Sequence, residues 1–465
     1  MTSARNTTLD LRAPLDLGLL PRRAAVDDAG RLSIAGVDIA ALADAHGTPL
    51  YVYDEDELRD RCRAYLDAFG RDAAGAADAH AGASYAAKAF LCIAMARLVD
   101  EAGLDLDVAS GGEAHVAHRA GFPPARMVFH GNNKSELELR LALTLPVGRL
   151  VIDGFDELDR VEALVAEGLP RPRVLLRVTP GVEAHTHEHI ATGAEDSKFG
   201  FSVANGAARD AAVRAKASDA VDLVGFHCHI GSQIVALDAY ARAAEVMATL
   251  AADVRDATGT VVEELNLGGG LGVGYTAEDL AGLPSIADFA AVVTDAHAVA
   301  CADAGLDPAP RLTVEAGRSI AAPAGLTLYR VGTVKAIPGV RTYVAVDGGM
   351  SDNPRPITYG ARYEAFLPAR VTSERRLTAT VAGKHCEQGD LLVRDAQLPD
   401  DVAVGDVLAT PATGAYAHSM ASNYNQLPRP AVVFVRDGTA RVVVRRETLD
   451  DLVSRDVPDR DQTEA

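Results

Sequence analysis

Residues 223–267, with the sequence LVGFHCHIGSQIVALDAYARAAEVMATLAADVRDATGTVVEELNL, contain the pattern that decides the fold. A short apolar run ends in polar and glycine residues, a long Ala-rich amphipathic stretch follows, and a second apolar run closes the segment. Short apolar runs bounded by glycine are typical of buried strands, and a longer amphipathic stretch is typical of a helix. The segment therefore predicts a strand, a helix and a second strand.

The same pattern recurs between about residue 80 and residue 320. The predicted strands are 84–89, 104–109, 127–131, 150–154, 174–179, 223–229, 264–267 and 312–315. Eight successive βα units in roughly 250 residues favour a closed (β/α)8 barrel over an open doubly wound sheet. We therefore predict an α/β fold with a TIM-like barrel over residues 50–320.

The rest of the chain has a different residue composition and a strand-like pattern. Val/Thr/Tyr-rich segments separated by Gly, Pro and Asp predict a β-rich sandwich or barrel domain over residues 321–453. Residues 1–49 are too few to form a domain alone, so we expect them, with a predicted strand and hairpin at 31–39, to join the β-rich domain and its sheet. The charged segment 454–465 is predicted to be a flexible tail.

Composition excludes several classes of protein. The 465 residues include 65 acidic and 45 basic side chains and no tryptophan, which argues against a nucleic-acid partner. No apolar run reaches membrane-spanning length, and residues 1–20 lack the features of a signal peptide, so we expect a cytoplasmic protein without a membrane role. The five cysteines are never arranged as C-x-x-C, which predicts free thiols.

Chemically distinctive residues fall at the ends of predicted barrel strands. They are Lys88, His229, the glycine run 268–270 and the segment 315–318. The carboxyl ends of barrel strands converge at one face, where active sites of such barrels are built. We therefore expect these four segments to face one cavity.

Each of these segments has two interpretations. Lys88 could extend its ammonium to the barrel rim, or its amine could form a Schiff base. The glycines of 268–274 could make a tight turn, or they could let backbone N–H groups approach a phosphate; they match neither the dinucleotide fingerprint nor the P-loop. Ser232 and Arg318 could add a hydroxyl and a positive charge to the same phosphate site.

Six motifs occur here in the order in which they occur in diaminopimelate decarboxylases. They are Tyr85-Ala86-Ala87-Lys88, His130-Gly131-Asn132-Asn133-Lys134-Ser135, Ser197-Lys198-Phe199-Gly200-Phe201, His229-Ile230-Gly231-Ser232-Gln233, Glu315-Ala316-Gly317-Arg318 and Cys386-Glu387-Gln388-Gly389-Asp390. The chain resembles this family of barrel-type pyridoxal-phosphate enzymes over nearly its whole length. The resemblance implies pyridoxal 5'-phosphate as cofactor and decarboxylation of meso-2,6-diaminopimelate to L-lysine and carbon dioxide.

The resemblance also assigns residues to the cofactor. Lys88 would form the Schiff base, and His229 would stack on the pyridine ring. Glu315 would keep the pyridine nitrogen protonated, so that the ring accepts the electrons released when carbon dioxide leaves; an alanine racemase would be expected to have an arginine there. Tyr416 would contact both cofactor and substrate. The residues implied in phosphate binding are Ser232, Gly269, Gly270, Gly317 and Arg318.

For the substrate, the resemblance implies that Cys386 is the general acid that returns a proton to carbon. The ordinary thiol pKa of about 8.5 suits that role near neutral pH. Arg318, Arg355 and Tyr359 would bind the distal carboxylate, since the planar guanidinium binds carboxylates with two hydrogen bonds. Glu387 would bind the distal ammonium. In this family Cys386 and Glu387 complete the site of the neighbouring subunit, which implies a homodimer.

Three other functions fit the sequence less well. An ornithine or arginine decarboxylase of the same fold would not need the two substrate arginines. A non-catalytic regulatory relative would be expected to lose Lys88 or Cys386, and a barrel hydrolase would explain the glycine run alone. The alternating His185, His187 and His189 lack accompanying cysteine or carboxylate ligands, so no metal site is predicted.

Two positions depart from the family pattern. Ala316 stands where proline is usual, and Gln388 stands where serine is common. Neither change removes a functional side chain. Because proline restricts the backbone, Ala316 could loosen the phosphate turn and weaken cofactor binding.

Overall fold

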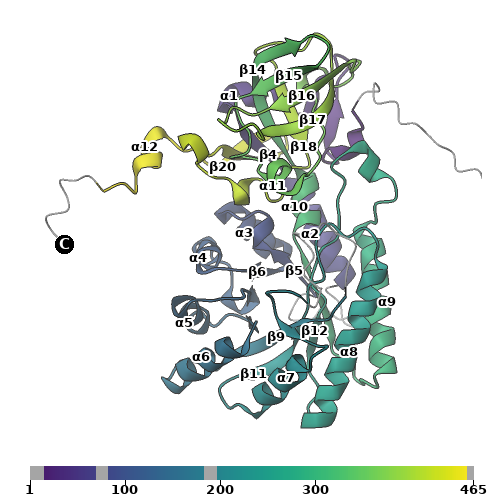
Figure 1. Ribbon diagram of the computed structural model, residues 1–465, viewed down its shortest axis with the longest axis vertical. Coiled ribbons are helices and arrows are strands. Elements are labelled where there is room, and N and C mark those ends of the chain that lie inside the picture. Colours follow the sequence, from purple (N-terminus) through teal and green to yellow (C-terminus); the bar gives the residue numbers. More distant parts are fainter. Residues whose placement is uncertain (1–14, 70–81, 183–195, 458–465) are drawn as a thin grey trace, which may run out of the picture. The chain divides into compact units, whose positions relative to one another are not determined.

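The computed structural model describes residues 15–69, 82–182 and 196–457 (Figure 1). The chain divides into two compact units. The barrel unit consists of Arg59–Val273 and Gly282–Ile320. The β-rich unit consists of Met1–Leu58, Gly274–Ala281 and Ala321–Ala465.

The barrel unit contains a closed ring of parallel strands. They are β5 (Ala83–Ala86), β6 (Asp105–Val108), β7 (Met127–Phe129), β8 (Arg149–Ile152), β9 (Arg173–Thr179), β11 (Asp222–His227), β12 (Glu264–Asn266) and β13 (Arg311–Ala316). Pairing of β8 with β9 and of β13 with β5 closes the ring, and the short β10 (Phe201–Ser202) pairs with β9 outside it. The predicted (β/α)8 barrel is confirmed.

Helices follow the strands and surround the ring in Figure 1. They are α2 (Glu55–Phe69), α3 (Ile93–Ala102), α4 (Gly111–Ala120), α5 (Glu136–Thr144), α6 (Phe155–Ala166), α7 (Ala207–Ala217), α8 (Asp238–Thr258), α9 (Ile286–Asp303) and α10 (Arg318–Ala324). The Ala-rich stretch of the deciding segment forms α8, whose buried face includes Ala244, Met247 and Ala251. α8 ends at Gly259, which adopts the left-handed conformation (φ 71°) that favours glycine.

Six barrel strands end earlier than predicted, and in two of them, β5 and β11, the difference concerns a site residue. β5 ends at Ala86, so Lys88 lies in a 3-10 turn, η2 (Ala87–Ala89), rather than in the strand. β11 ends at His227, two residues before His229. In both places the buried, largely apolar sequence continues into the turn, so the apolar pattern does not mark where the strand stops. The polar residues of interest are therefore carried by the turns.

The β-rich unit contains an eight-stranded sheet in the order β17-β16-β15-β14-β4-β19-β20, with β18 also paired to β14. The strands are β4 (Leu50–Asp54), β14 (Gly325–Ile337), β15 (Arg341–Val346), β16 (Leu377–Ala382), β17 (Leu391–Leu398), β18 (Val407–Pro411), β19 (Ala431–Arg436) and β20 (Thr439–Val444). All neighbours are antiparallel except β15 with β16 and β4 with β19. The predicted β-rich second domain is confirmed.

The N-terminal segment joins this unit mainly through its core. The predicted hairpin does not extend the large sheet, because β1 (Ala24–Val26), β2 (Leu32–Ile34) and β3 (Val37–Asp38) form a separate sheet followed by α1 (Ile39–His46). Its apolar side chains pack in one buried cluster with residues of β14 and β19. β4 and Gly274–Ala281, which the predicted division placed with the barrel, belong to the β-rich unit.

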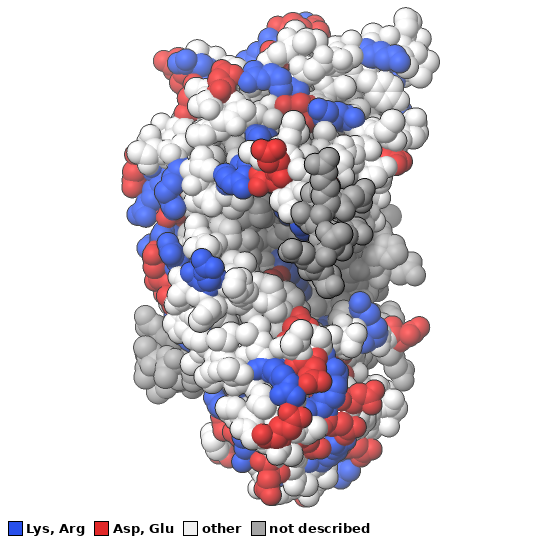
Figure 2. Space-filling model, turned by 90° about the vertical axis from the view of Figure 1, so that its left-hand side faces the viewer, with Lys and Arg blue, Asp and Glu red and all other residues white. Residues whose placement is uncertain are grey.

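Two short helices complete the unit, α11 (Arg355–Tyr359) and α12 (Leu449–Val453). The predicted tail, 454–465, lies for the most part outside the described residues. Over the described ranges, no helix combines the length and the apolar character needed to cross a membrane. Figure 2 shows acidic and basic side chains interspersed on the face it displays.

Candidate active site

A buried polar cluster lies at the carboxyl ends of the barrel strands. Glu315, in β13, is surrounded by ring and amide nitrogens: its Oε1 lies 2.9 Å from Nε2 of His227 and 3.4 Å from Nε2 of His130. The side-chain amide of Asn266 donates a hydrogen bond of 3.2 Å to the same oxygen. All four residues are buried. Burying a charge is costly without polar partners. The three neighbours supply these partners for the Glu315 carboxylate.

The pKa values of two carboxyl groups in this cluster shift in opposite directions. Burial opposes ionisation of Glu315, but His227 and His130 outweigh it and hold the pKa of Glu315 well below its ordinary value. Burial and the charge of Glu315 raise the pKa of Asp107, in β6, well above its ordinary value. Burial lowers the pKa of His130 to about 4, so its ring is neutral near pH 7. Two carboxyl groups whose pKa values shift in opposite directions thus lie in the same buried site, a separation typical of active sites.

The glycine run after β12 packs tightly against the neighbouring strand ends. A Cβ on Gly269 would lie 1.7 Å from the carbonyl oxygen of Glu315, and one on Gly270 would lie 2.4 Å from that of Gly231. Gly270 also has φ 118°, a region that other residues rarely adopt. This turn therefore requires glycine.

Two further residues that are predicted to bind the phosphate contact each other. Nη2 of Arg318 donates a hydrogen bond of 2.9 Å to Oγ of Ser232, so a guanidinium and a hydroxyl from distant segments meet. Gly317, directly before Arg318, is packed against the methyl groups of Ala86 and Ala89, each 3.2 Å from the place of a Cβ. A cation, a hydroxyl and a close-packed glycine turn are the donor set that a phosphate needs.

His229 and Lys88 belong to the same end of the barrel. The backbone N–H of Gly269 donates to Nδ1 of His229 at 3.3 Å, which fixes that ring nitrogen as an acceptor. Burial and the Lys88 ammonium lower the pKa of His229 well below its ordinary value, so the ring is neutral. Lys88 is exposed within the barrel unit. A neutral, half-buried ring therefore contacts the glycine turn, and the Lys88 ammonium is near enough to that ring to lower its pKa.

In the β-rich unit, Arg355 begins α11 and is buried. Its guanidinium lies 4.5 Å from the centre of the Tyr275 ring, and it donates a short hydrogen bond to the hydroxyl of Tyr363. Burial would lower its pKa, but the two tyrosines outweigh burial and raise it. Tyr359 and Tyr416, the other predicted substrate residues of this unit, are half-buried. Arg355 is therefore held rigidly with its charge intact.

Cys386 and Glu387 lie in a turn on the surface of the same unit. Asp390 holds this turn, because its Oδ2 accepts hydrogen bonds from the backbone N–H of His385 at 2.9 Å and pairs with Nδ1 of His385 at 2.7 Å. Its Oδ1 accepts a hydrogen bond of 2.7 Å from the backbone N–H of Met350, next to the turn that leads to Arg355. The two predicted substrate turns are thus joined by one carboxylate.

Comparison with known proteins identifies the family. The family model for the pyridoxal-dependent decarboxylase, pyridoxal binding domain, matches residues 55–322. The chain is 48% identical over 445 residues to a diaminopimelate decarboxylase of Mycobacterium tuberculosis (strain H37Rv), covering 94% of this chain and 97% of that protein. It is 48% identical over 430 residues to that of Bacillus subtilis (strain 168), covering 92% and 96%. The chain belongs to the diaminopimelate decarboxylase family.

Solved structures from this family have the same fold. The diaminopimelate decarboxylase of M. jannaschii matches with a TM-score of 0.87 and 33% identity, over 96% of this chain and 100% of that one. The Helicobacter pylori enzyme, solved in complex with L-lysine, matches with a TM-score of 0.79 and 32% identity, over 89% and 98%. The resemblance predicted from the six motifs is confirmed.

The barrel residues fit pyridoxal phosphate, the cofactor of this family. Ser232, Arg318 and the glycine turn suit its phosphate, and the ionised Glu315 suits a protonated ring nitrogen. His130, His227 and Glu315 also place three potential ligand atoms within 4.8 Å of one another, a spacing that a metal ion could use. The match to a pyridoxal-binding domain favours the ring nitrogen. The histidine-rich loop with His185, His187 and His189 lies outside the described residues.

Sequence reasoning missed three polar neighbours of Glu315. Asp107, His227 and Asn266 lie in no motif that was singled out, although each is a polar residue at a buried position of a predicted barrel strand. A polar residue within a predicted buried strand was the available signal, because burial of a polar group requires a partner. His227 also alternates with His229 along the chain, but only the tertiary structure shows which of the two meets Glu315.

The turn before Arg355 contains a carboxyl group that should make stability depend on pH. Burial, together with the charges of Asp390 and Asp347, raises the pKa of Asp352 to about 7. The folded protein therefore retains a proton that the unfolded chain releases, so this contribution to stability is fully present below about pH 4 and is lost by about pH 7. Replacing Asp352 with asparagine should remove a slope of at most about 1.4 kcal/mol per pH unit.

The measurement is the unfolding free energy of parent and Asp352→Asn at several pH values between 4 and 8. Asparagine keeps an acceptor for the N–H of Gly349, which donates to Asp352 at 2.7 Å, so the fold should survive. We expect the variant to gain stability relative to the parent as pH rises. Parallel profiles would show that Asp352 does not titrate in this range.

Proposed function

We propose that this protein decarboxylates meso-2,6-diaminopimelate at its D-configured centre, giving L-lysine and carbon dioxide, with pyridoxal 5'-phosphate as cofactor. The observation that carries the proposal is the match to diaminopimelate decarboxylases along 94% of the chain, together with the buried carboxylate Glu315. When bound, pyridoxal phosphate supplies a ring that accepts the electron pair of the bond to the departing carboxylate.

The barrel residues bind and orient that cofactor. Lys88 would hold it covalently through its amine. Ser232, Arg318 and the backbone of the glycine turn bind its phosphate, with Gly269, Gly270 and Gly317 allowing the close approach. His229 packs against the ring. Glu315 keeps a proton on the ring nitrogen, which its lowered pKa supports.

The β-rich unit supplies the groups that recognise and protonate the substrate. Arg355 and Tyr359, with Arg318, bind the distal carboxylate, and Glu387 binds the distal ammonium. Sγ of Cys386 delivers the proton that replaces carbon dioxide on the substrate carbon. Tyr416, at φ 61°, contacts cofactor and substrate.

We further propose a homodimer in which the Cys386 turn of each subunit completes the site of its partner. The exposure of Cys386 supports this, because the other four cysteines are buried. A general acid on the surface of its own unit needs a second surface to exclude water. The five cysteines form no disulfide with one another, which also supports a cytoplasmic location, where thiols stay reduced.

The test of the function is direct. Purified protein with pyridoxal phosphate should show the visible absorbance band of the covalently bound cofactor and should release L-lysine and carbon dioxide in equal amounts from meso-diaminopimelate. L-Ornithine and L-arginine serve as competing substrates. A band with diamine from ornithine instead of lysine would identify a different decarboxylase, and the absence of a band would favour a non-catalytic relative.

A further inference from the structure

The loop 422–427 contacts both substrate turns of the β-rich unit. The hydroxyl of Tyr424 donates a short hydrogen bond to Oε1 of Glu387. The side-chain oxygen of Asn425 accepts a hydrogen bond of 3.0 Å from the backbone N–H of Cys386. The backbone N–H of Ser422 donates at 2.9 Å to the carbonyl of Ser351. One loop therefore meets the proposed general acid, the proposed ammonium-binding carboxylate and the turn that leads to Arg355.

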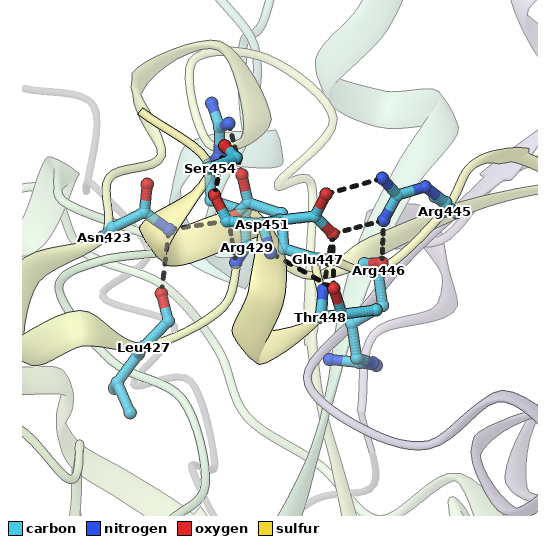
Figure 3. A network of polar contacts seen from close by, with 9 residues as sticks. All are labelled: Asn423, Leu427, Arg429, Arg445, Arg446, Glu447, Thr448, Asp451 and Ser454. Atoms are coloured by element: carbon cyan, nitrogen blue, oxygen red, sulfur yellow. Dashed lines mark hydrogen bonds and ion pairs between the residues drawn. The ribbon is translucent and has the colours of Figure 1, made fainter. Parts of the chain in front are cut away.

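The base of this loop is fixed by Glu447 (Figure 3). The side-chain amide of Asn423 donates to Oε2 of Glu447 at 2.6 Å and to the carbonyl of Leu427 at 3.0 Å, which closes the loop. The backbone N–H and Nε of Arg429 donate to the same carboxylate at 2.8 and 2.7 Å. The hydrogen bonds from Arg429 and Asn423 lower the pKa of Glu447 to about 2, so it stays ionised throughout the working range.

The ring of Tyr424 is also held by a neighbouring ring. Its ring stacks on that of His385, with ring centres 5.9 Å apart and planes inclined by 17°. His385 is buried and is itself fixed by Asp390. The hydrogen bond to Glu387 raises the pKa of Tyr424, so the phenol remains a donor. The hydroxyl therefore points at Glu387 from a supported position.

We propose that the loop 422–427 is a positioning element, in which Tyr424 orients the carboxylate of Glu387 and Asn425 fixes the backbone of Cys386. The inference rests on the proposed function, because Glu387 must bind the distal ammonium for its orientation to matter. A free glutamate on a surface samples several rotamers, and holding it in one of them before the substrate arrives reduces the entropy lost on binding. Tyr424 thus acts on affinity, whereas Asn425 acts on proton delivery.

Replacing Tyr424 with phenylalanine tests the first half. The variant retains the ring and its stacking on His385 but loses the hydrogen bond to the Glu387 carboxylate. Loss of a hydrogen bond to a charged acceptor corresponds to a change of about tenfold in substrate binding. In the holoenzyme we expect KM for meso-diaminopimelate to rise about tenfold with kcat within about twofold of the parent. Calorimetric titration should show the same weakening for L-lysine, which retains the distal amino-acid group.

Asn425→Gly tests the second half. Glycine tolerates the φ of 53° at this position, and the substitution removes only the acceptor for the Cys386 N–H. We expect kcat to fall about fivefold while KM stays near the parent value, the opposite split from Tyr424→Phe. Tyr343→Phe removes a hydroxyl from β15 in the same unit and serves as the matched control with unchanged constants.

Replacing Glu387 with glutamine distinguishes the role of the loop from the role proposed for Glu387 itself. If it raises KM while Tyr424→Phe changes neither KM nor lysine affinity, the role of the loop is overturned and the function stands. If Glu387→Gln leaves KM unchanged, the assignment of Glu387 is overturned together with the inference. Equal losses in both loop variants, without the split between KM and kcat, would indicate a structural role only and would also overturn it.

Discussion

Replacing Lys88 with alanine should reduce decarboxylation by at least about 10⁴-fold, because the variant loses the amine that attaches the cofactor and exchanges it onto the substrate. The cofactor's phosphate site should remain, since the hydrogen bond between Arg318 and Ser232 and the glycine turn do not involve Lys88. We therefore expect weak, non-covalent binding of pyridoxal phosphate. The visible band of the covalent form should be absent, and circular dichroism should show an unchanged fold.

The matched control is Lys216→Ala, at the end of α7 in the same barrel unit, which should keep both the band and the activity. Borohydride reduction of the parent followed by peptide mass analysis identifies the attached lysine independently of activity. A pyridoxyl group on a peptide other than the one with Lys88 would refute the assignment, as would a Lys88→Ala protein with full turnover.

The barrel could be predicted from sequence because its strands are buried on both faces. β9 and β11 consist almost entirely of buried residues, so each appears as a continuous apolar run without alternation. The predicted starts lie within one residue of those observed in these strands. The ends were less predictable, since the turns that carry Lys88 and His229 are as apolar as the strands before them.

The candidate site was predicted only where a motif carried it. Glu315, Ser232 and Arg318 lie in recognisable segments, and the structure brings Ser232 and Arg318 into hydrogen-bond contact although 86 positions separate them. Asp107 and Asn266 lie in no such segment, and their importance comes from the charge of Glu315, which belongs to a different strand. A pairing of this kind depends on the closure of the barrel and has no local sequence pattern.

The contacts of the loop 422–427 could not be predicted from the sequence for the same reason. Tyr424 and Glu387 are 37 positions apart. Tyr424 lies in a three-residue 3-10 helix and Glu387 in a turn, and both elements are too short to show hydrophobic periodicity. The left-handed Asn425 is compatible with many turns, so its residue type alone does not indicate a contact with Cys386. Only the tertiary structure shows that these turns meet.

Replacing Cys386 with alanine should lower kcat about 10³-fold while leaving the visible cofactor band intact, because the variant lacks the acid that returns a proton to carbon. The turn should persist, since Asp390 holds it through His385 and Met350 rather than through the thiol. Steady-state assays of L-lysine with parallel spectra give the measurement. Cys301→Ala, which removes a buried thiol from α9, should have no such effect.

The same two inactive variants test whether the site is shared between subunits. If Cys386 serves the partner's site, a mixed dimer of Lys88→Ala and Cys386→Ala contains one site with both residues intact. Random exchange in an equal mixture then restores about a quarter of the parent activity, since half of the dimers are mixed and each has one working site. If each subunit used its own Cys386, every site would lack one residue and mixing would restore nothing.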